Sequence, residues 1–331
     1  MKIESVYKKG FTLIEMIMVI VIAGILSIGT FISLKHIYLR AAKSKAINEL
    51  SQTSTQVSAQ IASLLHDRVP SSVIGYDVVK KEFYPVTDVS DASILEWIST
   101  AREAFLHRDY SGFVDMNDSV ATSDMLKSPD TDVNAISQTI QKKFDTTLNI
   151  YDNDLVGIIF AGAFDNGNLI LSDDFNDSFG WHGNSANAIY NIKSTSSGDE
   201  LYLKSHPNEI YEKYYLVDSA YAIARGENLD RNTIESNCHY DLSFIKDEGD
   251  FNNTLFLFYN YRPWKKETFC GDPNLFGAES KEGNVTVLAT NVAGFRVNVV
   301  NSGLQFSITF KKDISSDKKH TVTVSKQKVV F

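Results

Sequence analysis

Histidine, cysteine and acidic side chains are the residues most able to carry chemistry in this 331-residue chain. None of the histidines falls in the HExxH spacing of zinc peptidases, and neither a GxSxG elbow nor a Walker A loop is present. The sequence therefore predicts a protein that is not an enzyme. The seven histidines are His36, His66, His107, His182, His206, His239 and His320.

Oxygen ligands suited to a hard cation gather in one acidic segment. Asp173, Asp174 and Asp177 lie close together, and Asp165 and Asn166 precede them. Calcium prefers such carboxylate and amide oxygens, but the spacing is not that of an EF-hand loop. Asn and Asp are also common in solvated turns for backbone reasons. We therefore predict an acidic loop and no cofactor, with calcium at these three aspartates as the alternative.

Aromatic and basic side chains alternate in a second segment, where they could stack on single-stranded DNA. However, the chain is acidic, with 41 Asp and Glu residues against 32 Lys and Arg residues and a net charge of -9. Affinity for phosphates comes chiefly from Lys and Arg. We therefore expect packing at a strand end, and nucleic acid is not the expected partner. The residues are Tyr259, Tyr261, Arg262, Trp264, Lys265 and Lys266.

The segment 11–34 is apolar except for one carboxylate, Glu15. Its length, at ~1.5 Å per helical residue, is enough to cross a bilayer core of ~30 Å. Basic residues among the ten residues that precede it favour a cytoplasmic N-terminus and an exported C-terminal part, although basic residues also follow the apolar run. A carboxylate inside a membrane span is costly, so Glu15 needs a partner or a place near the headgroups.

Residues Gly10 to Glu15, with the sequence GFTLIE, follow this short leader and begin the apolar run. They resemble the prepilin signal of type IV pilins and type II secretion pseudopilins. The resemblance implies that a membrane peptidase cuts after Gly10 and methylates the new terminal amine of Phe11. Glu15 of one subunit could then pair with the Phe11 ammonium of a neighbour, because two buried opposite charges offset each other's desolvation. The alternative is a single-pass anchor with an incidental glutamate near the headgroups.

Apolar residues continue to recur at three- and four-residue multiples until Pro70, which predicts one helix from Phe11 to about His66. The fold class that we expect is α+β and pilin-like. A long N-terminal helix, its first half transmembrane, would pack on a C-terminal antiparallel sheet domain. The expected parts are a leader (1–10), the transmembrane half (11–34) and exported half (35–69) of the helix, a variable helical insertion (70–150), and a β-rich globular domain (151–331).

Within the soluble part, Ser93 to Glu96 resembles a capping box that opens a helix reaching Phe105, and Val133 to Phe144 predicts a second helix. Alternating apolar and polar residues then predict strands, the last three forming a meander. The predicted strands are Leu155–Phe160, Asn168–Leu171, Ala188–Ile192, Glu200–Leu203, Tyr214–Ala224, Tyr240–Ile245, Thr254–Tyr261, Val292–Val300, Leu304–Phe310 and Thr321–Val330.

The C-terminal half also resembles the larger minor pseudopilins of the PilW and PulJ (GspJ) group. The similarity lies in YYLVDSAY at 214–221, LATNVAGF at 288–295 and the late strand Ser307–Phe310. The chain departs from that group in the long insertion at 70–150.

Cys238 and Cys270 would meet oxidising conditions in an exported domain, where a disulfide between them is expected. A zinc site needs four ligands, and His239 adds at most one. Free buried thiols are the other alternative.

Two function classes compete in these patterns, and a membrane-tethered periplasmic enzyme is a third alternative that would need a cleft with perturbed titratable groups. The first is a minor pilin or pseudopilin at the tip of a type IV pilus or type II secretion-like fibre, where it helps to initiate assembly. Its partners would be other pilins, the prepilin peptidase and an inner-membrane assembly platform. It would sit in the bacterial inner membrane with its globular part in the periplasm, before reaching the fibre tip. The second is a tip-borne adhesin or DNA-binding module that uses the insertion at 70–150.

Overall fold

The computed structural model describes residues 10, 12–85, 92–119, 124–161, 175, 177–207, 209–300, 303–314 and 320–331. The chain forms two compact units. The first comprises Met1–Gln52 with Lys312–Thr323, and the second comprises Thr53–Lys311 with Val324–Phe331.

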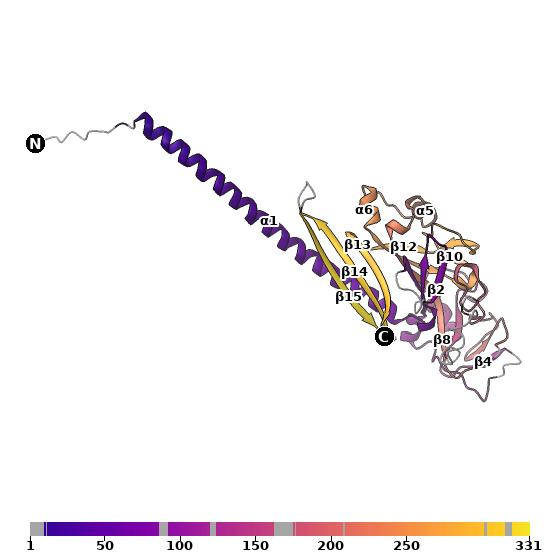
Figure 1. Cartoon of the computed structure of the whole chain (residues 1–331). Coiled ribbons are helices and arrows are strands. Elements are labelled where there is room, and N and C mark those ends of the chain that lie inside the picture. The colour runs from indigo at the N-terminus through magenta and orange to yellow at the C-terminus, as the bar shows by residue number, and fades with distance from the viewer. Residues whose placement is uncertain are drawn as a thin grey trace, which may run out of the picture. The chain divides into compact units, whose positions relative to one another are not determined.

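One helix, α1 (Leu13–His66), contributes to both units and confirms the predicted spine (Figure 1). In the first unit, Ala46 and Leu50 are buried, and Nζ of Lys312 lies 2.8 Å from the carboxylate of Glu49. In the second unit, Val57, Ile61 and Leu65 are buried. Successive members of this set are four or seven positions apart, so they form one apolar stripe of the helix. The helix ends just before a short 3₁₀ turn at Pro70–Ser72, as the proline predicts.

The second unit is built around an antiparallel sheet to which eight strands of the described residues belong. Its central strand is β8 (Tyr214–Arg225), which pairs with β3 (Ile94–Thr100) and β9 (Leu255–Tyr261). Long antiparallel pairing around a buried strand gives the sheet a rigid centre. The remaining strands are β1 (Ile74–Asp77), β2 (Glu82–Pro85), β5 (Gly157–Phe160), β6 (Tyr190–Asn191) and β12 (Asn284–Ala289). The strand order along the sheet is β12-β9-β8-β3-β1-β2. In addition, β5 pairs with β8, and β6 pairs with β5.

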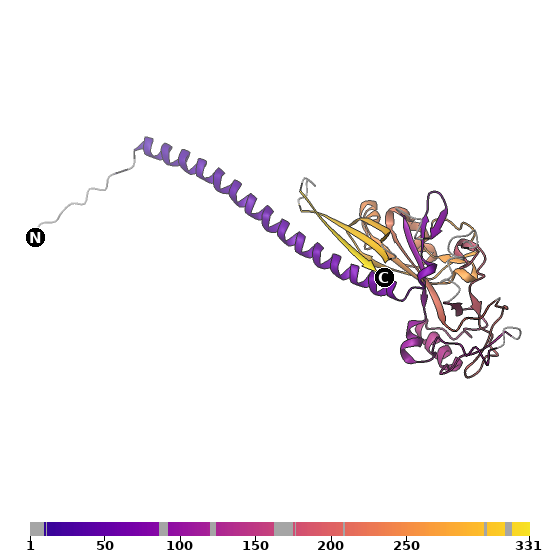
Figure 2. The ribbon, with the colours of Figure 1, turned by 60° about the horizontal axis from the view of Figure 1, so that its bottom comes forward.

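Two of the hydrophobic clusters among the described residues of this unit lie on the sheet. One packs β3, β8 and β9 against the loops around Trp181 and the disulfide, and it includes Phe256, Phe258 and Phe269. The other packs α2 (Arg102–His107) and α3 (Val133–Lys143) beside the first half of β8 and β5, through residues such as Ala104 and Ile136. Figure 2 shows α2 and α3, in magenta, at the end of this unit opposite the orange helices α5 (Arg231–Asn237) and α6 (Glu248–Asn252).

The C-terminal strands form the predicted meander, a three-stranded sheet of β13 (Val292–Val300), β14 (Gly303–Asp313) and β15 (Thr321–Val330). The antiparallel pairing of β13 and β14 runs from Val292 with Phe310 to Val300 with Gly303. Two small sheets complete the described fold: β4 (Met125–Lys127) with β7 (Glu200–Tyr202), and β10 (Glu267–Phe269) with β11 (Ser280–Glu282).

Two sequence-based assignments are wrong. The helix expected over Ser93–Phe105 is instead the strand β3, followed by the short helix α2, because residues 94–99 are all buried and line both faces of a central strand. The strand expected at Tyr240–Ile245 is irregular, and its buried residues Leu242 and Ile245 are three positions apart, which does not fit a strand. The expected strand Asn168–Leu171 lies outside the described residues. Residues 70–150 contain β1 to β4 as well as two helices, and the limits of the insertion stay a prediction.

A buried polar network crosses the larger core. Nε2 of His182 lies 2.9 Å from the carboxylate of Glu96, and Nδ1 lies 3.7 Å from that of Asp272. Tyr261 donates a hydrogen bond to the same Glu96 carboxylate at 2.7 Å, and Tyr76 donates to Asp272 at 3.3 Å. All five residues are buried. Burial alone would lower the pKa of His182, but the adjacent Glu96 and Asp272 carboxylates raise it overall, and burial raises the pKa of Asp272.

These shifts predict a stability that falls as pH rises. Because the folded state holds protons on His182 and Asp272 more tightly than the unfolded state, the stabilisation by His182 is complete below pH ~6.5 and is lost above it. We expect the free energy of unfolding to fall as pH rises above about 6.5, by up to about 1.4 kcal/mol per pH unit for the proton held on His182. Denaturant unfolding of the full chain in detergent, repeated across this range, measures the slope.

The variant His182→Gln should flatten this slope. The exposed His107 offers a matched control, and His107→Gln should keep the wild-type slope. An equal slope in wild type and His182→Gln would contradict the assignment to His182.

A disulfide joins Cys238 to Cys270, with a Cα–Cα distance of 5.2 Å. Cys238 follows α5, while Cys270 follows β10 and is fully buried. The bond therefore connects the α5 loop to the larger core.

Reduction of this disulfide should destabilise the second unit. The bond spans a sequence separation of 32 residues, and closure of a loop of this length is worth about 3–4 kcal/mol in the chain-entropy model. We expect dithiothreitol to lower the free energy of unfolding of the wild type by about this amount. Cys238→Ser should have the lower stability without reductant and should not respond to it. Two labelled thiols in denatured, unreduced protein would contradict the prediction.

Candidate functional site at the N-terminus of the first helix

Thr12 and Glu15 form a reciprocal pair at the start of α1. The backbone N–H and the hydroxyl of Thr12 both donate to Oε2 of Glu15, each at 2.9 Å. The backbone N–H of Glu15 in turn donates to Oγ1 of Thr12 at 3.4 Å. This arrangement is a capping box, in which the two residues satisfy backbone N–H groups that the first turn of a helix leaves without partners.

The capping box gives Glu15 a role within its own chain. Sequence reasoning considered only the charge of Glu15 and missed this role, although the Thr-x-x-Glu spacing before an apolar run is a signal that predicts it. A helix N-terminus also favours a negative charge electrostatically. The chain therefore supplies hydrogen-bond partners for this carboxylate by itself.

Gly10 lies immediately before this cap and is exposed. A Cβ at Gly10 would meet no atom within 4 Å, so the fold does not require a glycine there. Phe11 lies outside the described residues, and cleavage between Gly10 and Phe11 with methylation of Phe11 stays a prediction.

The first half of α1 exposes an almost continuous apolar surface, with Leu13 80% and Phe31 71% exposed. Two of the hydroxyls within it, those of Ser27 and Thr30, are satisfied by the helix itself, because Ser27 donates to the carbonyl of Ala23 at 2.7 Å and Thr30 to that of Leu26 at 2.8 Å. Such internal satisfaction is what a lipid environment demands. Among the described residues, α1 is the one helix long and apolar enough to span a membrane. Its first half is suited to membrane anchoring.

The candidate calcium ligands fall mostly outside the described residues, which include Asp177 but not Asp173 or Asp174. Asp177 is exposed. Within the part of the chain that the structure describes, no three His, Cys, Asp or Glu side chains are arranged to hold a metal ion.

The aromatic and basic cluster near the end of β9 is packed into the protein. Tyr261, Arg262 and Trp264 are buried. Nε of Arg262 donates to the carbonyl of Leu155 at 3.1 Å, and Nε1 of Trp264 donates to that of Asp154 at 3.0 Å. These rings are therefore not free to stack on bases.

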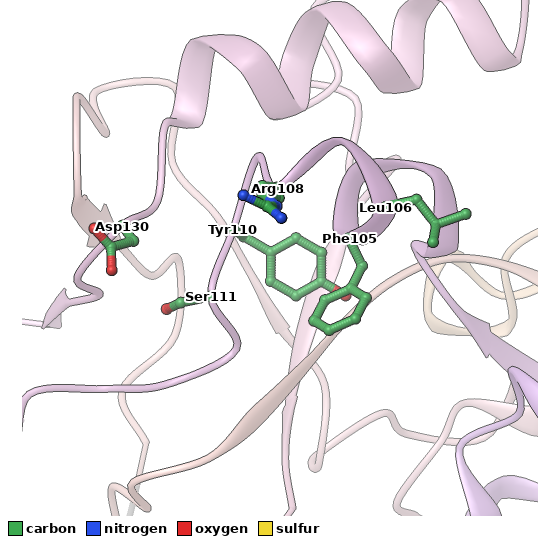
Figure 3. A pocket seen from close by; sticks show the side chains of 6 residues that line it. All are labelled: Phe105, Leu106, Arg108, Tyr110, Ser111 and Asp130. Carbon is green, nitrogen blue, oxygen red and sulfur yellow. The ribbon is translucent and has the colours of Figure 1, made fainter.

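A surface hollow of about 330 Å³ lies beside α2 (Figure 3). Phe105 and Tyr110 make an edge contact in it, with ring centroids 5.7 Å apart. It contains one serine and no histidine, so its lining lacks the paired nucleophile and base of covalent catalysis. The lining residues are Phe105, Leu106, Arg108, Tyr110, Ser111 and Asp130.

Comparison with known proteins bears on the N-terminal segment. A family model described as the prokaryotic N-terminal methylation motif matches residues 6–31, which include Gly10, Thr12, Glu15 and most of the apolar run. No curated protein and no solved structure matches the chain. The chain therefore carries the N-terminal signal of type IV pilin-like proteins on a helix suited to membrane anchoring.

Proposed function

We propose that the protein is a minor pilin or pseudopilin, a structural subunit of a type IV pilus or type II secretion-like fibre. The observation that carries this proposal is the methylation motif at residues 6–31 on a 54-residue helix whose apolar first half is exposed. Such a surface is stable in lipid before assembly and against the apolar helices of other subunits afterwards.

Glu15 is the residue proposed to set the register between subunits. Both donors of Thr12 bind the same oxygen, Oε2. The carboxylate can therefore approach the Phe11 ammonium of a neighbour while its capping contacts persist. In an apolar surrounding this pairing is strong because neither charge is then left without a partner.

The size of the folded part supports a place at the fibre tip. Packed helices lie about 8–10 Å apart, so the heads of successive subunits compete for space around a helical fibre core. The second unit, from Thr53 to Lys311, is large, and a large head is accommodated most easily at an end. A tip subunit is also the first in the fibre, and it would help to initiate assembly.

The proposed partners are other pilins, the prepilin peptidase and an inner-membrane assembly platform. The head would face the periplasm, where the disulfide between Cys238 and Cys270 would be maintained. Resemblance of the C-terminal half to the PilW and PulJ (GspJ) group supports a minor rather than a major subunit.

Processing at Gly10 is the first test. In the native host with an active prepilin peptidase, mass spectrometry of the mature N-terminus should find methylated Phe11. We expect Gly10→Val to retain its leader, because no atom of the fold lies within 4 Å of the position that its Cβ would take and the effect must then arise at the peptidase.

Gly24→Ala offers a matched control, since Gly24 also has open space around it. This variant should be processed like the wild type. A mature wild-type protein that begins at Met1 would refute the processing proposal.

Substitution of Glu15 separates its two roles. Glu15→Gln keeps a side-chain acceptor for the capping box but removes the charge, whereas Glu15→Leu removes both. If the charge pairs with a neighbouring ammonium, both variants should insert and be processed, and both should crosslink to neighbouring pilins several-fold less than the wild type. The measurement is crosslinking in membranes with equal subunit levels.

Wild-type crosslinking in Glu15→Gln together with a loss in Glu15→Leu would assign Glu15 to capping alone. Wild-type crosslinking and fibre output in both variants would overturn any assembly role for this residue.

A further inference from the structure

Three charged side chains from different elements meet beside the central strand. Nζ of Lys143, at the end of α3, lies 2.8 Å from Oδ2 of Asp218 in β8. The same Nζ lies 2.8 Å from Oε2 of Glu103 in the first turn of α2. One amine therefore stands between two carboxylates.

The cluster is shielded from water on the side of Asp218. The side chain of Asp218 is fully buried and that of Lys143 is 15% exposed, whereas that of Glu103 is 47% exposed. Lys143 also lies over the ring of Phe144, 5.2 Å from its centroid. The amine and the Asp218 carboxylate thus share an enclosed site that opens to solvent through Glu103.

The backbone directs Asp218 into this site. Ser99 pairs with Ser219 and Thr100 pairs with Val217, so Asp218 is the extra residue of a β-bulge between β3 and β8. Bulges re-aim side chains and are common next to reactive sites. Oδ1 of Asp218 has no hydrogen-bond partner. A buried carboxylate with one bare oxygen is unfavourable as an anion and much less so as a neutral amide.

We propose that Lys143 and Asp218 are an autocatalytic crosslinking site, at which an amide bond forms between Nζ and Cγ with Glu103 as the proton-transfer group. The interacting oxygen Oδ2 is bonded directly to Cγ, so the 2.8 Å contact places the nucleophile next to the carbon that it attacks. This inference is independent of the proposed role in a fibre.

The reaction is a condensation without an oxidant or other co-reactant. Nζ gives up a proton and its electron pair forms a bond to Cγ of the protonated carboxyl group. The Cγ–Oδ2 bond then breaks, and Oδ2 leaves as water. Of the three protons on the original ammonium, one stays on the amide nitrogen and two depart with the water, so Asp218 and Lys143 become neutral and Glu103 is unchanged.

Glu103 is needed because the amine begins as an ammonium. Burial alone would lower the pKa of Lys143, but Asp218 and Glu103 raise it, so a neutral amine forms only by passing a proton to a neighbour. Burial alone would raise the pKa of Glu103, but Lys143 lowers it overall, so Glu103 is ionised. Its Oε2 lies 2.8 Å from Nζ of Lys143, which places an acceptor in direct contact with the proton that must leave. Burial raises the pKa of Asp218, which favours the protonated acid that the attack requires.

Fixed geometry lowers the barrier, because well-oriented intramolecular reactions reach effective molarities of about 10⁵–10⁸ M. The equilibrium favours the amide because the condensation removes two charges from an enclosed site and leaves a neutral group there. The product would tie α3 covalently to β8, across 75 residues of sequence.

Peptide mass spectrometry of the full chain tests the proposal. The protein is purified in detergent, reduced, denatured and digested with trypsin, which does not cut at an acylated lysine. In the wild type we expect residues 143–193 joined to residues 214–225, lighter than the two peptides together by one water molecule. Without the bond, residues 144–193 and 214–225 appear separately.

Matched variants identify the residues. Lys143→Arg and Asp218→Ala should give only separate peptides, and Lys142→Arg, a change at the exposed neighbour, should keep the joined species. Glu103→Gln keeps both reacting groups at a partly exposed position and should reduce the joined fraction at least tenfold. Lys204 and Asp154, also 2.8 Å apart but each 33% exposed, are an internal control that should stay separate.

Only separate peptides in the folded wild type would overturn the proposal and leave an ion pair. An unchanged joined fraction in Glu103→Gln would overturn the role of Glu103. Circular dichroism of each variant before digestion shows whether it folds. If Lys143→Arg does not fold, Glu103→Gln, which retains both reacting groups, still tests the proposal.

Discussion

The molecule depends on one continuous helix that has to satisfy two environments. The first half of α1 carries exposed apolar side chains that water cannot solvate favourably, while its last turns bury Val57, Ile61 and Leu65 in the second unit. At ~1.5 Å per residue, its 54 residues span roughly 80 Å. The exposed apolar residues and the buried residues therefore belong to one element, α1, that contributes to both compact units.

At the start of this helix the polar groups are the costly ones, because a carboxylate and several N–H groups without helical partners lie next to an apolar surface. The contacts between Thr12 and Glu15 resolve both problems together, since the N–H groups gain an acceptor and the carboxylate gains donors. This explains how the chain by itself can tolerate Glu15 beside an apolar surface. In the proposed fibre, the Phe11 ammonium of a neighbour would add the charge compensation that hydrogen bonds from neutral groups cannot provide.

Local signals in the sequence predicted the parts of the fold that local physics determines. Apolar periodicity and Pro70 gave the limits of α1, and alternation gave β13 and β15 residue for residue. The segment 94–99 was assigned wrongly because a strand buried on both faces has no alternation to distinguish it from a helix. The motif at residues 10–15 indicated the N-terminal site. Its Thr-x-x-Glu spacing is also the local signal of a capping box, so the sequence could have predicted that contact. The contacts of Glu96 with His182 and of Lys143 with Asp218 join residues 86 and 75 positions apart, so only the folded topology brings them together.

The contact between Lys143 and Asp218 lies near the place where the chain leaves α1 and is hydrogen-bonded to the sheet. Just after α1, the N–H of Val69 donates to the carbonyl of Ile98 at 2.8 Å, and the N–H of Thr100 donates to the carbonyl of Asp67 at 2.8 Å. Thr100 is also the residue at which β3 reaches the bulge that holds Asp218. The segment that follows α1 is therefore hydrogen-bonded to β3, and β3 pairs with β8 at the bulge where Asp218 contacts Lys143 of α3. The crosslink proposed between Lys143 and Asp218 would reinforce the same part of the sheet to which the end of α1 is connected.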